Sequence, residues 1–445
     1  MKLGKLSLVA VMALGTSAFA IDNVKVNGEA KVWYQTSEYS GAGAGATTSQ
    51  DFFDNDTNSL AEVKLSVGAT ADLLQSLSAG VKVTALSTLG LENNMVGAVP
   101  AAKFDATGTS AGAAQLDDQS WTEELYLAYT MGKTTAKIGR QALSTPLAFT
   151  ENWNVVDNTF EAAVLLNNDL PDTTLVAAYV GKHNGVGLLK TTTGRGSTVA
   201  YSGKFTNFGT EGAYAAGAIN KSIPNTTVQG WYYNVSAIAD AFWLQADAKV
   251  MDMVTIGVQY AGMDPKLSRA TVIAAGYVAG NEDLAGVKKS SDVFAVKAAV
   301  DVAGVNLYAA YSEVSDGTLG FANTATGDKS SLYTSLGSIW LDGEIAAAPD
   351  TDTWKIGAST KLIPGVTLST SYAESEVGAN AGAIAAVAGA ATASTDFTAW
   401  DVVAATKVGP VDLTAIYTQF DKDVKATDTT DKTTDTIRII ASLKF

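Results

Sequence analysis

The chain of 445 residues contains no cysteine and a single histidine, His183. Without cysteine there is no disulfide and no thiolate metal site, and one histidine cannot build a multi-histidine metal site. A catalytic site in which a histidine base activates a serine or carboxylate nucleophile is improbable too, because only one histidine is present. The composition therefore predicts a protein that is not an enzyme and that binds no metal and no cofactor.

Charged residues are also few, at 17%, against about 25% in soluble domains. Asp and Glu number 45 and Lys and Arg 30, an acidic excess of 45 − 30 = 15, so a basic surface for nucleic acid is excluded. After residue 20 no run rich in Leu, Ile or Phe reaches the roughly 18 residues of a membrane-spanning helix. The apolar tract at 378–394 is mostly Ala and Gly. Helical membrane spans are therefore not expected.

The N-terminus has the pattern of a secretory signal peptide. Lys2 and Lys5 precede a short apolar run at 6–14, which is followed by the small-residue motif Ala18-Phe19-Ala20. The apolar run is too short to span a bilayer. We expect cleavage after Ala20, which divides the chain into a signal peptide at 1–20 and an exported domain at 21–445.

Alternation of apolar and polar residues dominates the rest of the chain, and it predicts strands with two different environments on their faces. Near the start, Val26, Ala30 and Val32 share one face. Lys25, Glu29 and Lys31 share the other. The pattern predicts eighteen strands, which begin near Val24, Leu60, Leu77, Trp121, Thr134, Asn158, Thr173, Gly212, Thr226, Asp240, Val254, Asp292, Val305, Asp352, Val366, Asp396, Val411 and Thr434.

Short turns and long loops alternate between these strands. The turns include 132–133, 363–365 and 409–410, whereas the long loops include 37–59, 88–120 and 315–351. This layout is typical of an outer-membrane barrel. Lipid offers no hydrogen-bond partner, so a spanning sheet must close on itself, and a barrel of eighteen strands is too wide for side chains to fill. The predicted fold is an all-β transmembrane antiparallel barrel of about 18 strands, with short periplasmic turns, long extracellular loops and a water-filled pore.

Aromatic residues support this fold. In seven of the nine strands that run from a short turn toward a long loop, a tyrosine ends the apolar face, as expected for a ring at a lipid boundary. The chain ends on Phe445, which resembles the terminal aromatic signal read by the barrel assembly machinery of the outer membrane. The seven tyrosines are Tyr34, Tyr179, Tyr232, Tyr260, Tyr311, Tyr372 and Tyr417.

Several segments resemble the major outer-membrane porins of epsilonproteobacteria, the campylobacter-type general porins. They include WTEELYLAY at 121–129, KTTAKIGRQ at 133–141, TPL at 145–147, NTFEA at 158–162 and LPDTTLVAAY at 170–179. The similarity runs along the whole exported domain. It implies an 18-stranded porin of the outer membrane, usually a homotrimer, that passes small hydrophilic solutes by diffusion.

In such porins the loop after the fifth strand folds into the lumen. The corresponding loop here is 144–157, and it carries Glu151 and Asp157, which we expect to face basic groups on the barrel wall and to select ions. Arg140 is the strongest wall candidate because it ends the fifth strand, although each candidate could simply pair with a cross-strand neighbour. The wall candidates are Lys31, Lys64, Lys82, Lys137, Arg140, Lys297 and Arg438, with Glu29, Glu62 and Glu124.

These observations predict passive diffusion of small hydrophilic solutes and ions, with a weak preference for cations because the loops are acidic. A substrate-specific channel is an alternative, but it calls for an inward run of one sign, and the wall mixes signs. A structural or adhesive surface barrel is the other. The expected partners are outer-membrane lipid and lipopolysaccharide, the assembly machinery through Phe445, small hydrophilic solutes and two further copies of the chain.

Overall fold

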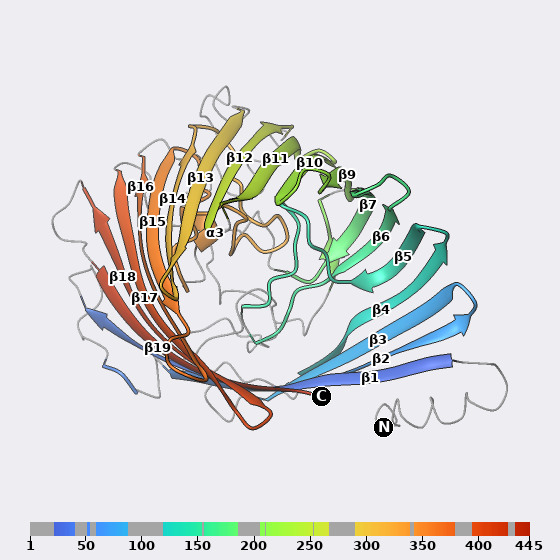
Figure 1. Ribbon diagram of the computed structural model, residues 1–445, viewed down its shortest axis with the longest axis horizontal. Helices are drawn as coiled ribbons and strands as arrows, with labels where there is room; N and C mark the ends of the chain where they lie inside the picture. Colours follow the sequence, from blue (N-terminus) through green and yellow to red (C-terminus); the bar gives the residue numbers. More distant parts are fainter. Residues whose placement is uncertain are drawn as a thin grey trace, which may run out of the picture.

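The structure is a computed structural model, and it forms a closed antiparallel β-barrel around a wide lumen (Figure 1). No helix in the described part of the chain is both long and apolar enough to cross a membrane. The described residues are 22–40, 51–53, 59–87, 119–153, 155–185, 205–209, 211–251, 253–266, 290–338, 342–378, 394–425 and 432–445.

Each long strand pairs with its neighbours in the chain. The short β8 (Thr206–Asn207) pairs only with the end of β7, so eighteen strands make up the barrel. These are β1 (Asp22–Ser40), β2 (Ser59–Leu74), β3 (Leu77–Ser87), β4 (Gln119–Met131), β5 (Thr134–Gln141), β6 (Phe160–Asn167), β7 (Thr173–His183), β9 (Ala213–Asn220), β10 (Thr226–Val235), β11 (Ala239–Val250), β12 (Val254–Pro265), β13 (Ser291–Val302), β14 (Val305–Val314), β15 (Thr351–Thr360), β16 (Val366–Val377), β17 (Thr395–Val408), β18 (Val411–Val424) and β19 (Lys432–Lys444).

The predicted fold class and strand count are confirmed. Every predicted strand start lies within two residues of an observed one, from Val24 against Asp22 to Thr434 against Lys432. The prediction succeeds because each strand separates lipid from the lumen along its whole length, which keeps the alternation strict.

Pairing of β1 with β19 closes the barrel, from Glu29 opposite Lys444 to Ser40 opposite Thr433. Phe445 extends this seam, because its backbone exchanges hydrogen bonds of 2.7 and 3.0 Å with Gly28. A Cβ atom on Gly28 would lie 2.4 Å from the Phe445 ring, so only glycine fits there. No sheet edge is left for the lipid to cover at this seam.

The outer face of the barrel is apolar, and it carries aromatic residues near the long-loop end of the strands. Tyr179 lies beside Tyr214, with ring centres 5.1 Å apart and the rings tilted by 47°, and Trp400 lies beside Tyr417 at 6.0 Å. Tyr232 and Tyr260 are exposed on the same face. This arrangement matches the predicted boundary ring.

Residues 315–350, here called L7, connect β14 to β15, and the described parts of L7, 315–338 and 342–350, fold into the barrel (Figure 1). The expectation that this segment is an external loop was therefore wrong. Its buried Leu319 and Phe321 pack against Trp231 and Trp243 of the inner wall. Apolar side chains in a Gly- and Ser-rich segment need cover, and the lumen supplies it.

Candidate pore constriction

Residues 142–159, here called L3, connect β5 to β6 and include the predicted inward loop. Thr150 donates its N–H to the Leu143 carbonyl at 2.8 Å, and the Asn158 side chain binds the backbone of Glu151 and Phe149. These bonds satisfy backbone groups that no strand partner reaches. L3 is therefore an ordered structure of its own.

The inner end of L3 is fixed by an apolar contact with the wall of β1–β4. Val155 and Val156 are buried against Trp33 and Trp121, and Leu60, Leu86 and Ile440 complete the cluster. Burial of two valines and two tryptophans removes apolar surface from a lumen that would otherwise be wet. L3 is consequently packed against the inner wall formed by β1–β4.

L7 covers the opposite side of the lumen. Leu319 and Leu332 pack on the inner wall of β10–β13, while Leu336 and Ile345 pack on Phe397 of β17 and its neighbours. Ile345 ends the single short helix described in the loop, α3 (Asp342–Ile345). The two halves of L7 thus rest on different parts of the wall.

L3 and L7 meet inside the barrel through several hydrogen bonds. Thr324 donates both its N–H and its hydroxyl to the Leu147 carbonyl, at 2.8 and 2.6 Å. Asn323 donates to the Phe149 carbonyl at 2.9 Å and accepts its N–H at 3.3 Å. Ser331 donates to the Pro146 carbonyl at 2.7 Å. The constriction is therefore made by both loops.

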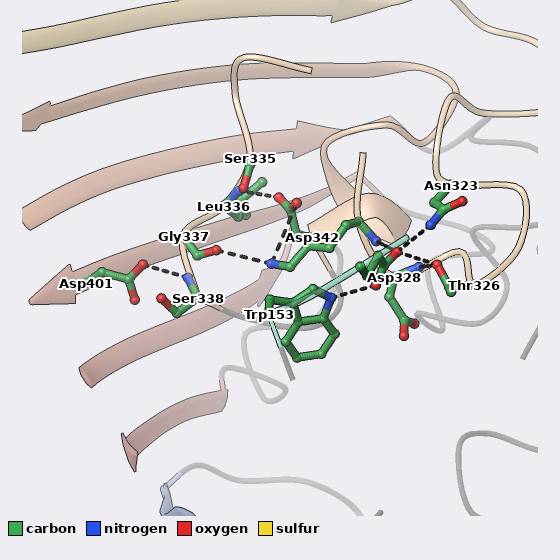
Figure 2. Close-up of polar contacts among 12 residues, drawn as sticks. Trp153, Asn323, Thr326, Asp328, Ser335, Leu336, Gly337, Ser338, Asp342 and Asp401 are labelled. Atoms are coloured by element: carbon green, nitrogen blue, oxygen red, sulfur yellow. Dashed lines mark hydrogen bonds and ion pairs between the residues drawn. The ribbon is translucent and has the colours of Figure 1, made fainter. Parts of the chain in front are cut away.

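Glu151 is at the centre of this contact. Its Oε1 accepts hydrogen bonds from Asn323, Thr326 and the Lys329 backbone, and its Oε2 accepts one from Trp153 at 2.6 Å (Figure 2). Burial raises the pKa of Glu151, Asp328 raises it further, and the donors from Thr326, Trp153 and Asn323 oppose that rise. The structure brings Glu151 to L7, not to a base on the barrel wall as we had expected.

The tip of L7 is held by charged groups of the wall. Arg438 on β19 donates to the Ser338 carbonyl and, at 2.7 Å, to Gln35 of β1. Asp401 on β17 accepts the Ser338 N–H at 2.6 Å (Figure 2). Lys355 on β15 donates to the Ser335 carbonyl at 2.7 Å. Arg438 is 3% exposed, so its charge is covered by the loop that it holds.

Lys297, another predicted wall residue, also contacts L7, through Tyr333. Its ammonium lies 2.6 Å from Asp247 and 4.1 Å from the centre of the Tyr333 ring, and the Tyr333 hydroxyl donates to Asp247 at 2.9 Å. A Cβ atom on Gly257 would come within 2.7 Å of all three side chains. Glycine at that position makes room for the cluster.

The predicted cations on the other side of the lumen lie close together. Lys64 pairs with Glu29, Lys31 lies 3.7 Å from Glu29, and Lys82 pairs with Glu123 at 2.6 Å. Asp157 of L3 lies within electrostatic range of all three lysines. Burial and Glu123 raise the pKa of Asp157, and the lysines oppose this rise. Asp157 thus faces the wall bases, and Lys64 is completely buried beneath the loop.

Glu123 was missed in the sequence because a bulge changes the alternation. The pairing of β3 with β4 shifts between Lys82 and Val83, so Glu123 is an extra residue whose side chain turns inward. Glu124 also points inward, near Lys82 and Lys137, and the Lys137 ammonium lies 3.6 Å from the centre of the Tyr126 ring. Glu62 is buried on the same wall. No sequence signal marks the bulge.

Arg140 lies on the outer face of the barrel, which differs from its predicted place in the lumen. It is opposite Leu125 and Glu161 in the register, and Leu125 belongs to the lipid-facing row with Leu127 and Tyr129. Three positions separate Arg140 from the inward Lys137, and alternation places residues three apart on opposite faces. Arg140 pairs with Glu161 at 3.0 Å.

Comparison with known proteins supports the fold. No family model and no curated protein matches the sequence. Among solved structures, Pseudomonas aeruginosa OccK8 (OprE) matches with a TM-score of 0.68 at 15% identity, covering 96% of this chain and 99% of that one. P. aeruginosa OpdK with vanillate gives 0.66 at 12% (96% and 99% covered), and OccK2 (OpdF) in complex with glucuronate gives 0.63 at 12% (96% and 98% covered). The chain has the fold of these 18-stranded barrels.

The constriction contains ion pairs and hydrogen bonds and no cluster of metal ligands among the described residues. On the β1–β4 side, Lys31, Lys64 and Lys82 lie near Glu29, Glu123 and Asp157, and Glu62 and Glu124 lie on the same wall, so both signs of charge face the lumen. Such a site can orient dipolar solutes and discriminate ions by charge.

Proposed function

We propose that this protein is an outer-membrane porin that forms a water-filled channel for passive diffusion of small hydrophilic solutes and ions. One observation carries the proposal. L3 and L7 meet inside a barrel that side chains alone cannot fill, so the space they leave is a narrowed aqueous path. Buried Glu151 and the hydrogen bonds around it hold this narrowing in one arrangement.

The acidic excess of the chain supports a weak preference for cations, because an acidic mouth attracts cations and repels anions. Within the constriction, the lysines of β1–β3 are matched by nearby carboxylates. Neither sign dominates at the narrowest region, which favours weak selectivity over a strict one.

Single-channel conductance of the refolded protein in planar bilayers tests the proposal, with a salt gradient to give the reversal potential. We expect stepwise, ohmic openings and a small cation-directed potential. A folded barrel that never conducts would contradict the proposal and favour a structural or adhesive surface barrel.

A substrate-specific channel is the second candidate, and the inward fold of L7 favours it. Two loops define a more restricted opening than one, and proteins of the same fold have been crystallised with vanillate and with glucuronate. Addition of such carboxylates at millimolar concentration separates the candidates. Block by one solute class indicates a specific channel, whereas equal conductance with all of them indicates a general one.

We further propose membership of the campylobacter-type general porins, export through a signal peptide at 1–20, recognition of Phe445 by the barrel assembly machinery of the outer membrane, and, from the family resemblance, a homotrimer. The segments at 121–141 and 158–179 support the family, and the exposed C-terminal aromatic supports the assembly signal. Cross-linking of the protein in native membranes tests the trimer, and N-terminal sequencing of the mature chain tests cleavage after Ala20.

A further inference from the structure

The outer face of the barrel carries a charged group that the pore does not use. Arg140 on β5, Glu161 on β6 and Lys182 on β7 lie side by side and are called here the outer triad. Glu161 is 3.0 Å from Arg140 and 3.6 Å from Lys182. Arg140 also donates to the Thr122 carbonyl at 3.0 Å and lies 4.2 Å from the centre of the Phe205 ring. The triad is therefore held in a defined geometry.

A bulge turns Lys182 outward. Val180 lies opposite Ala162, but Lys182 lies opposite Glu161, so Gly181 is an extra residue in β7. Val180 is buried on the inner face, and simple alternation would have placed Lys182 there too. The extra residue instead puts the ammonium beside Arg140, with 46% of its side chain exposed.

The depth of the triad in the membrane follows from the register. Ile138, Ala163 and Tyr179 form one row across β5–β7, and the triad is the next outward-facing row toward the long loops. Tyr179 and Tyr214 belong to the aromatic boundary ring. Charges just beyond such a ring lie at the level of the lipid head groups.

An apolar groove of about 410 Å³ lies directly below the triad on the same strands. Small side chains form its floor, namely Ala136, Ala163, Ala177 and Ala216, and its upper end lies at Tyr179 and Tyr214. The groove is shallow, and its apolar lining on the lipid-facing surface suits a hydrocarbon chain.

On β14–β18 the rim has the opposite charge. Glu313, Asp352, Glu376, Asp396 and Asp423 lie directly opposite one another on β14–β18, in the outward row that begins at exposed Phe294. Lys425 pairs with two of these carboxylates and leaves the row acidic. Glu211, near the triad, is bound to Ser236 at 3.0 Å. At the triad, two cations share one carboxylate.

We propose that the outer triad and the groove below it bind one lipopolysaccharide molecule of the outer leaflet, with a phosphate at Arg140 and Lys182 and an acyl chain in the groove. The guanidinium offers a planar pair of donors to phosphate oxygens, and Lys182 adds a point charge. Glu161 keeps the two cations in place when no lipid is bound. This inference rests on the proposed outer-membrane function.

Binding of hexa-acylated lipid A to the detergent-solubilised protein, followed by native mass spectrometry, tests the proposal. The variants are Arg140→Gln, Lys182→Gln and Glu161→Gln, with Lys133→Gln at the opposite end of β5 as a matched control. Each lost cation should weaken binding about fivefold, whereas Glu161→Gln should strengthen it and Lys133→Gln should leave it unchanged. Filling of the groove by Ala177→Phe should weaken binding without a change in charge.

Two further probes identify the ligand. Dephosphorylated lipid A should bind as weakly to the wild type as lipid A does to the double variant Arg140→Gln with Lys182→Gln. Phosphatidylglycerol should bind less well than lipid A. Equal binding of all three lipids, or wild-type binding by the double variant, would overturn the proposal. Loss of oligomers in Arg140→Gln with no effect on lipid binding would also overturn it and assign this face to a second copy.

Conductance of the same variants separates this inference from the proposed function. The triad lies outside the lumen, so Arg140→Gln and Lys182→Gln barrels should conduct like the wild type. If the wild-type protein does not conduct, the proposed porin function is contradicted, whether or not lipid A binds. If the protein conducts but does not bind lipid A, only the proposed lipid site is contradicted.

Discussion

The two sides of the lumen use similar charged residues for different purposes. On β1–β4 the wall lysines pair with carboxylates of the wall and lie near Asp157 of L3. On β13–β19, Lys355 and Arg438 instead donate to backbone carbonyls at the tip of L7, and Lys297 joins a cluster with Tyr333. One side balances charge, and the other anchors a loop. An inward charge in a barrel is therefore not by itself a pore-lining charge.

Removal of L7 should have the largest effect on the channel. Replacement of residues 319–347 by a short Gly-Ser linker takes away half of the constriction and leaves β14 and β15 joined. We expect a several-fold increase in single-channel conductance. An unchanged conductance would mean that L7 does not narrow the path, and the two sides would then not differ as described.

Release of the tip of L7 should have the next largest effect. The double variant Lys355→Gln and Arg438→Gln removes charge-assisted hydrogen bonds to Ser335 and Ser338, each worth about 1.5–3 kcal/mol. We expect a lower unfolding temperature and noisy openings, because the loop can leave the wall. Quiet openings of wild-type size would contradict the anchoring role.

On the other side, Lys82→Gln should act on selectivity. It leaves buried Glu123 without its cationic partner, at a cost of about 3 kcal/mol, and makes the site more negative, while the hydrogen bond from Thr84 remains. The reversal potential should move further toward cations. The double variant Lys82→Gln with Glu123→Gln should restore both stability and potential. Failure of that restoration would show that the pair is not the relevant unit.

The contact between the loops should depend on pH through Glu151. Since its pKa is raised in the folded protein, protonation is favoured there over the unfolded chain, and the contact gains stability as the pH falls toward the ordinary value of 4.5. Openings should become quieter between pH 7 and pH 5. Glu151→Gln should remove this dependence. A contact that loosens in acid would reverse the sign and contradict the burial argument.

Arg140→Gln should have the smallest effect on the pore. Because Arg140 faces away from the lumen, the reversal potential should stay at the wild-type value, in contrast to Lys82→Gln. A clear shift in the reversal potential would mean that Arg140 faces the lumen, and it would contradict the register of β4 and β5.

Alternation along the sequence was enough to locate all eighteen barrel strands, because every strand separates lipid from the lumen. The inward fold of L3 followed from resemblance to a porin family. The position of L7 could not be predicted, since a loop rich in Gly, Ser and Thr has the same composition inside or outside a barrel. The bulges at Glu123 and Gly181 could not be predicted either. One extra residue does not change the composition of a strand, yet it moves the side chains that follow to the opposite face of the sheet.

The most direct test of the shared constriction uses the absence of cysteine from the chain. The Ser331 hydroxyl donates to the Pro146 carbonyl at 2.7 Å, so the two residues are in contact. Cysteines placed at these two positions should form a disulfide in the folded barrel. A pair at Lys133 and Ser331 is the control and should stay reduced. We predict near-complete cross-linking of the first pair with conductance close to wild type. Free thiols at Pro146 and Ser331 in a conducting barrel would contradict the contact between L3 and L7.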